Sequence, residues 1–136
     1  MNKKVVMGIR LLLGLIFVAG GVGGFLTMNG FIAAPPPELP PKALVLMNAL
    51  VETGLWNLVK LTEVVCALLL LSNRYVPLAI TILAPIVVNI SFFHLFLDHK
   101  GIPIVVVLVA AEVILARAYR ESFRGMLNSK VDLSQP

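Results

Sequence analysis

The chain has 136 residues, of which 59% are hydrophobic and 13% charged, with a formal net charge of +4 and a mean hydropathy of +0.97. A soluble domain usually carries about 25% charged residues, so this chain is too apolar to cover its surface with polar side chains. Its basic residues flank apolar runs, which excludes a nucleic-acid-binding face, and its single cysteine excludes an internal disulfide and a Cys-x-x-Cys redox pair.

The first apolar segment covers residues 5–26 and follows Lys3 and Lys4. A membrane span needs about 20 apolar residues, and this segment is longer than the apolar core of a signal peptide, so we interpret it as an uncleaved span. Gly20 and Gly24 form a G-x-x-x-G pattern within it. Small residues let helices approach closely, so the pattern predicts a packing face, either within the molecule or in a dimer.

Residues 28–54 form the first connection, which we expect to lie outside the membrane. The proline-rich stretch 35–41 must be extended, because proline lacks an amide donor and restricts φ. Residues 42–53 then predict a short helix between Pro41 and Gly54, lying at the outer interface or dipping into the bundle. A single helix over residues 42–71, kinked at Gly54, is the alternative.

Three further apolar segments cover residues 55–71, 76–97 and 102–118, joined by two connections of four residues each. Connections this short force neighbouring helices to run antiparallel, and the alternating polarity of a membrane β-barrel is missing. We therefore predict an all-α fold in a single domain. It is an antiparallel membrane four-helix bundle with a short extra helix in the first external loop and a tail over residues 119–136, whose first part continues the last helix.

Lysine and arginine counts predict the orientation. If the N-terminus is cytoplasmic, eight basic residues lie on the cytoplasmic side and only Lys42 and Lys100 on the other. This bias predicts a multi-pass protein of the cell inner membrane with both termini in the cytoplasm, where the basic tail can contact anionic lipid headgroups. The eight residues are Lys3, Lys4, Arg10, Arg74, Arg117, Arg120, Arg124 and Lys130.

Two charged residues interrupt the second span. Lys60 and Glu63 are three residues apart and share one helical face with Trp56. A charge at membrane depth costs about 2.5–3.5 kcal/mol, so each needs a partner or a purpose. Two interpretations stay open: an ion pair that is only structural, or a polar pocket that binds a ligand headgroup or moves a proton.

The third span carries polar groups of its own. Asn89 shares a stripe with Phe92 and can hydrogen-bond to a neighbouring helix, whereas His94 lies near the outer boundary and fits an interfacial histidine better than a ligand-binding one. His94, Asp98 and His99 lack the further ligands of a metal site, so we predict none.

Arg10 in the first span and Glu112 in the fourth lie in the inner half of antiparallel neighbours. We therefore expect them to form a structural intramembrane pair, in preference to a catalytic role for Glu112. Ser72 and Ser91 have no placed base, and the histidines cannot hold haem across a bundle. We predict no catalytic residues, and an independent enzymatic activity is not expected.

Several segments resemble the DoxX family of small bacterial membrane proteins, and the resemblance covers essentially the whole chain. They are Thr-Gly-Leu-Trp-Asn-Leu-Val-Lys-Leu-Thr-Glu at 53–63, Arg-Tyr-Val-Pro-Leu-Ala at 74–79, Ala-Pro-Ile-Val-Val-Asn-Ile at 84–90 and Phe-His-Leu-Phe-Leu at 93–97. The resemblance implies a four-helix inner-membrane bundle. The family takes its name from a small subunit of a terminal quinol oxidase, and relatives are linked to thiosulfate:quinone oxidoreduction.

The resemblance carries Lys60, Glu63, Asn89 and His94 over as a candidate site, while Ala67 departs from the glycine that the family often has. Together with the residues, it predicts a ligand-binding or accessory subunit of membrane redox chemistry that binds a quinone or a lipid. A small proton-coupled carrier acting as a homo-oligomer is the alternative. A redox-complex partner is also expected. The candidate ligand-binding residues are Trp56, Lys60, Glu63, Asn89, Phe92 and His94.

Overall fold

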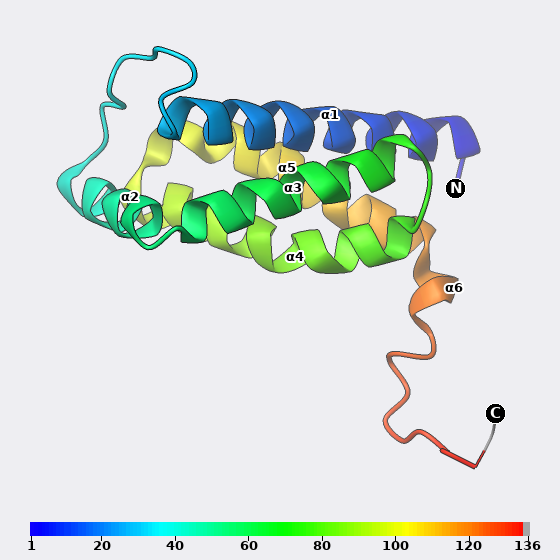
Figure 1. Cartoon of the computed structure of the whole chain (residues 1–136). Helices are drawn as coiled ribbons and strands as arrows, with labels where there is room; N and C mark the ends of the chain where they lie inside the picture. Colours follow the sequence, from blue (N-terminus) through cyan, green and yellow to red (C-terminus); the bar gives the residue numbers. More distant parts are fainter. Residues whose placement is uncertain (135–136) are drawn as a thin grey trace.

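The structure is a computed structural model that describes residues 1–134, so the last two residues of the expected tail lie outside the described residues. Within this range the chain is helical and contains no strand, which confirms the all-α prediction (Figure 1). A π-helical turn, Phe93–Leu97, continues α4, and a 3₁₀ turn, His99–Gly101, leads into α5. The helices are α1 (Lys3–Met28), α2 (Pro41–Glu52), α3 (Leu55–Leu71), α4 (Val76–Phe92), α5 (Ile102–Ala118) and α6 (Arg120–Phe123).

The helix bounds follow local signals in the sequence. The Asn2 side chain accepts a hydrogen bond from the Lys4 amide (2.9 Å) and so caps the start of α1. Pro41 occupies the first position of α2, where its missing amide hydrogen costs nothing. Gly54 separates α2 from α3 in the left-handed conformation, with φ of 79°, which glycine adopts without strain. Residues 42–71 therefore form two helices, and not one kinked helix.

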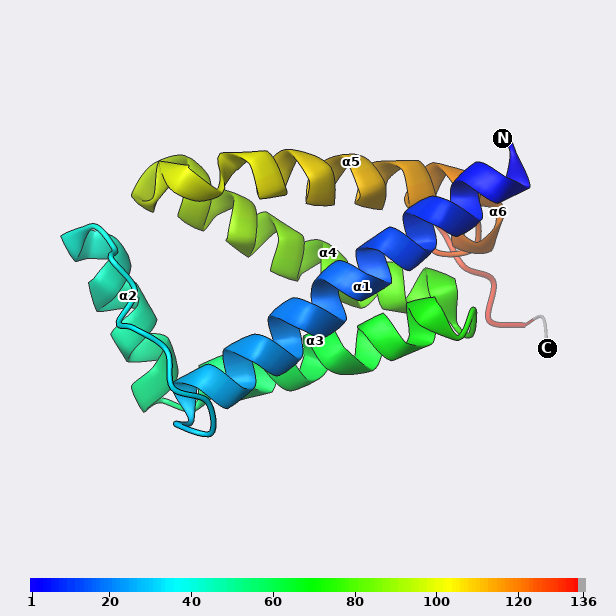
Figure 2. The same ribbon diagram turned by 90° about the horizontal axis from the view of Figure 1, so that it is seen from above.

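The four long helices pack around one apolar core. The most extensive contact is between α1 and α3. α4 packs between α3 and α5, and α5 also packs against α1. Figure 2 shows these helices gathered near the chain termini, whereas α1 and α3 diverge from α5 toward the opposite end, where α2 lies crosswise. The core draws buried side chains from all four helices: Leu13, Phe17, Cys66, Leu70, Leu83, Leu108 and Leu115.

Within residues 1–134, three stretches are long and apolar enough to cross a membrane: α1, Val76–Leu97 and His99–Ala118. α3 has 17 residues and is therefore only about 25 Å long, less than the hydrocarbon core of a typical bilayer. Its axis is bent by 82° from that of α2. By length and composition, α3 alone is too short to be counted among these stretches, and a fourth span is counted when the bent pair of α2 and α3 is taken together.

The C-terminal tail departs from the prediction. α5 ends at Ala118, and the short α6 leaves the bundle in a different direction (Figure 1). The expected continuous extension of the last helix into the tail is therefore wrong. The sequence carries no proline or glycine at this break, where Tyr119 is half-buried against the core.

Candidate functional site

The predicted ion pair between Lys60 and Glu63 forms within α3. Lys60 Nζ lies 3.0 Å from Glu63 Oε2 and 3.3 Å from Oε1, so the ammonium donates to both carboxylate oxygens. The Glu63 side chain is 3% exposed and that of Lys60 is 14% exposed. The pair thus neutralises a buried carboxylate and leaves the lysine partly accessible.

Trp56 covers this pair from the preceding turn of α3. Lys60 Nζ lies 4.5 Å from the centroid of the indole ring, a distance that allows a cation–π interaction. The indole Nε1 donates a hydrogen bond to the carbonyl of Gly24 on α1 (3.1 Å). The Trp56 ring is therefore fixed by Lys60 on one side and by the Gly24 carbonyl on the other. The prediction that Trp56, Lys60 and Glu63 share one helical face is confirmed.

Glycines of α1 provide the space for this cluster. A Cβ atom on Gly24 would lie 2.8 Å from Lys60 Cε and 3.3 Å from Trp56 Cζ2, and one on Gly21 would lie 2.7 Å from Val64 Cγ2. Gly20, in contrast, has open space around it. Gly21 and Gly24 therefore form the packing face of α1 against α3. Of the two glycines in the G-x-x-x-G pattern, only Gly24 takes part in it.

A pair of asparagines joins α1 and α3 at the α2 end of the molecule. Asn29 Nδ2 donates to Asn57 Oδ1 (2.8 Å), and Asn57 Nδ2 donates back to Asn29 Oδ1 (3.2 Å). The sequence analysis did not identify this contact. Its only sequence signal is a polar amide at the end of one apolar segment and another at the start of the next.

Asn89 and Phe92 do not join the Lys60 cluster. Both are exposed on the outward face of α4, and the Phe92 ring packs against Phe96 with a centroid distance of 5.1 Å. Lys60 instead faces α1. The expectation that Asn89 and Phe92 line one pocket with Lys60 is wrong, because their stripe of α4 is turned away from the core.

His94 is held by the π-helical turn. Its Nδ1 lies 3.0 Å from the Asp98 carbonyl oxygen, its ring meets Phe93 edge-on, and a side chain on Gly101 would collide with it. These contacts suit a histidine that closes the connection between α4 and α5. In the part of the chain that the structure describes, no three His, Cys, Asp or Glu residues gather to hold a metal ion.

The expected Arg10–Glu112 pair does not form. Arg10 is buried, and its Nη1 donates to the Leu70 carbonyl at the C-terminal end of α3. Glu112 is also buried, yet neither of its carboxylate oxygens has a hydrogen-bond partner among the residues that the structure describes. The Leu70 carbonyl also accepts a hydrogen bond from the Asn73 amide (3.3 Å), so Arg10 reinforces the C-terminal end of α3, and this interaction replaces the predicted ion pair.

Two cavities lie at opposite ends of the molecule. One, of about 390 Å³, opens between the start of α2 and the π-helical turn and is lined by Pro40, Pro41, Lys42, Phe96 and Leu97. The other, of about 470 Å³, lies at the end that holds the N-terminus and includes Arg10 in its lining. Neither cavity is lined by Lys60 or Glu63.

Comparisons with family models, with curated proteins and with solved structures found no match to this chain. The resemblance to the DoxX family therefore stays a prediction based on the segments around Lys60, Asn89 and His94.

Proposed function

We propose that this chain is a DoxX-like protein of the bacterial cytoplasmic membrane that crosses the bilayer four times, with both termini in the cytoplasm. α3 would be the fourth span. A four-residue turn joins it to the stretch Val76–Leu97, and it packs along α1. Both of these neighbours are long and apolar enough to cross a membrane. The 17 residues of α3 suit a locally thinned bilayer. The bias of basic residues supports this orientation.

Within this membrane, the proposed function is to bind an amphipathic ligand, a quinone or a lipid, as an accessory subunit of membrane redox chemistry. One observation carries the proposal: the Lys60–Glu63 pair is buried beneath Trp56 among apolar helices. A lysine ammonium has three N–H donors. The contacts with Glu63 leave a donor available to a ligand carbonyl or phosphate oxygen, and the lysine is the more accessible member of the pair.

The outward stripe of α4 has a different proposed role. Asn89 and Phe92 are exposed there beside apolar side chains, so they would face lipid or another protein. An amide can both donate and accept a hydrogen bond between membrane helices. This stripe is therefore the proposed contact with a redox-complex partner or a second copy of the chain.

Ligand binding can be tested by mass spectrometry of the protein purified in a mild detergent. The wild-type protein should carry a quinone or a phospholipid that the double variant Lys60→Met/Glu63→Gln loses, because that variant removes both polar groups and leaves no unpaired charge. Asn89→Ala is the matched control and should keep the ligand, because Asn89 lies on the outward face. Equal ligand content in all three proteins would refute the proposal.

A proton-coupled carrier is the second candidate function, and Glu112 favours it. A carboxyl group buried without a hydrogen-bond partner is costly, and such groups within membrane helices commonly mark proton pathways. In this function Glu112 takes up and releases the proton, and a homo-oligomer encloses the transported solute. Proton flux into proteoliposomes distinguishes the carrier from the accessory subunit.

A further inference from the structure

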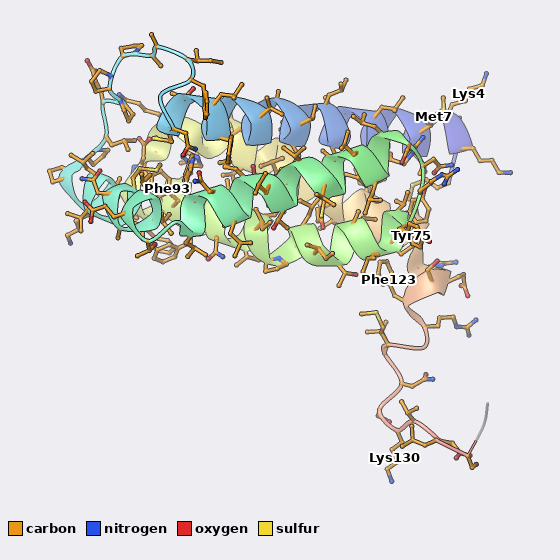
Figure 3. All side chains as sticks on the ribbon, viewed as in Figure 1. Lys4, Met7, Tyr75, Phe93, Phe123 and Lys130 are labelled. Atoms are coloured by element: carbon orange, nitrogen blue, oxygen red, sulfur yellow. The ribbon has the colours of Figure 1, made fainter. Side chains whose placement is uncertain are left out.

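The cavity at the N-terminal end lies among three segments that are distant in sequence. It is bounded by the first turns of α1, the turn between α3 and α4, and the end of α5, and Figure 3 shows Met7 and Tyr75 at this same end. Its volume of about 470 Å³ falls in the range of small-molecule sites, about 300–1,000 Å³. The lining residues are Met1, Lys3, Val6, Met7, Arg10, Asn73, Ala118 and Tyr119.

Arg10 brings an incompletely compensated positive charge to this cavity. It is 7% exposed, and one of its five N–H donors binds the Leu70 carbonyl. The C-terminal end of a helix carries about half a negative charge, so α3 compensates only part of the guanidinium charge. None of the ion pairs formed among residues 1–134 includes Arg10, and the cavity lining contains no acidic side chain.

The other groups around the cavity add to its positive potential. Lys3 lines it with its ammonium-bearing side chain, and the N-terminal end of α1 contributes its partial positive charge. Asn73 and Tyr119 offer uncharged polar atoms. A planar guanidinium suits the oxygens of a phosphate, which it can bind through two parallel hydrogen bonds.

We propose that this cavity binds the phosphate group of an anionic ligand, with Arg10 at its base and Lys3 at its mouth. Two sources supply this chemistry: the headgroup of an anionic phospholipid and free phosphate. Basic pockets between membrane helices on the cytoplasmic side are known sites for lipid headgroups. The inference is independent of the Lys60 cluster, since none of its residues lines this cavity.

A pair of neighbouring lysines provides the most direct test, because both are exposed in the first turn of α1 and only Lys3 lines the cavity. The full chain in detergent micelles is titrated with phosphatidylglycerol and, separately, with phosphatidylcholine, and binding is followed by native mass spectrometry. Lys3→Glu should weaken phosphatidylglycerol binding about tenfold, whereas Lys4→Glu should bind as the wild type does. Phosphatidylcholine should bind weakly to all three proteins.

Arg10→Gln should weaken binding of phosphatidylglycerol more than tenfold, because it removes the charge-assisted hydrogen bonds to the phosphate. Inorganic phosphate that displaces the lipid at millimolar concentration would identify the free anion as a ligand, and failure to displace it would identify the headgroup. If Arg10→Gln fails to fold, the comparison of Lys3 with Lys4 decides. Wild-type affinity in both Lys3→Glu and Arg10→Gln would overturn the proposal.

The same variants separate this site from the proposed ligand site. Arg10→Gln and Lys3→Glu should still carry whatever ligand the wild-type protein retains beside Lys60, and Lys60→Met/Glu63→Gln should still bind phosphatidylglycerol. Loss of both ligands in either set would show that one site serves both and would overturn the independent phosphate site.

Discussion

At the scale of single residues, the two buried glutamates differ in what satisfies them. Glu63 has Lys60 three residues earlier on the same helical face, so its partner is provided within α3. Glu112 has no cation at that spacing, and the nearby Arg117 is exposed. Its oxygens stay without partners in the interior of the molecule. The Glu63 carboxylate is stabilised by its ion pair with Lys60. The unpaired Glu112 carboxyl lowers stability, which suggests that it has a functional role.

Leucine substitutions should separate these two glutamates by opposite effects on stability. Glu112→Leu removes an unsatisfied polar group, so the free energy of unfolding should rise by about 1–3 kcal/mol. Glu63→Leu leaves the largely buried Lys60 ammonium without its carboxylate, so stability should fall, by up to about 3 kcal/mol because the lysine is partly accessible. Thermal unfolding of the purified proteins measures both, and proton flux should vanish in Glu112→Leu if the carrier function holds. A lower unfolding temperature for Glu112→Leu would show that this carboxyl has a partner after all.

At the scale of elements, the contact between α1 and α3 depends on which glycines face α3. Gly14, Gly21 and Gly24 all lie where a Cβ atom would come within 3.0 Å of an α3 side chain. Gly20 and Gly23 point into open space. The close approach lets Trp56 reach the Gly24 carbonyl and lets α1 cover the Lys60 side chain. The glycine face of α1 is therefore part of the candidate site.

Two substitutions on α1 test this assignment. Gly24→Leu should separate α1 from α3 and lower stability by about 1–3 kcal/mol, because the added atoms collide with Lys60 and Trp56. Gly20→Leu should leave stability unchanged or raise it slightly, because leucine is a better helix former and meets no neighbour. The shift of tryptophan fluorescence on heating reports the contact directly, since Trp56 is the only tryptophan. Equal destabilisation by both substitutions would indicate that Gly20 also lies in an interface.

Element bounds were predictable where the chain carries local stop signals. The predicted spans at 55–71 and 102–118 coincide with α3 and α5, because polar connections containing Ser72 or Gly101 bound them. The π-helical turn and the break at Tyr119 were not predictable in this way. At the π-helical turn the His94 ring contacts the Asp98 carbonyl and fills the space above Gly101, and at the break Tyr119 packs on the core.

At the scale of the whole molecule, the two ends differ in chemistry. The end with the N-terminus combines Lys3, Arg10 and the basic tail, whereas the opposite end carries α2 and the short turn at Lys100 (Figures 1 and 3). α2 buries one face, at Ala43, against the rest of the molecule. Its exposed apolar residues suit a position at the membrane surface. This asymmetry is what the orientation proposal rests on.

Cysteine labelling tests the orientation. Lys100→Cys should react with a membrane-impermeant maleimide on intact spheroplasts, whereas Asn128→Cys should react only after permeabilisation. The native Cys66 is 1% exposed and should give no background in either case. The reverse pattern would place the C-terminal tail outside, and labelling of both positions on intact spheroplasts would mean that α5 does not cross the membrane.

The sequence by itself determined where the long helices lie, marked Gly54 as a break or a kink, and placed Lys60, Glu63 and Trp56 on one helical face. These features depend on interactions within a few residues of one helix: apolar runs, proline and glycine at helix ends, and side chains three or four residues apart. No packing partner has to be known to predict them. The same local logic correctly placed Asn89 and Phe92 on one stripe of α4.

Only the tertiary structure decided how each helix is rotated about its own axis. That rotation turns Asn89 and Phe92 outward, presents Gly21 instead of Gly20 to α3, and brings Arg10 to the Leu70 carbonyl and not to Glu112. The physical reason is that these helices are apolar on nearly every face, so hydrophobic periodicity does not distinguish inside from outside. Close packing of glycines against α3 and the hydrogen bond of Arg10 to the end of α3 then select the rotation.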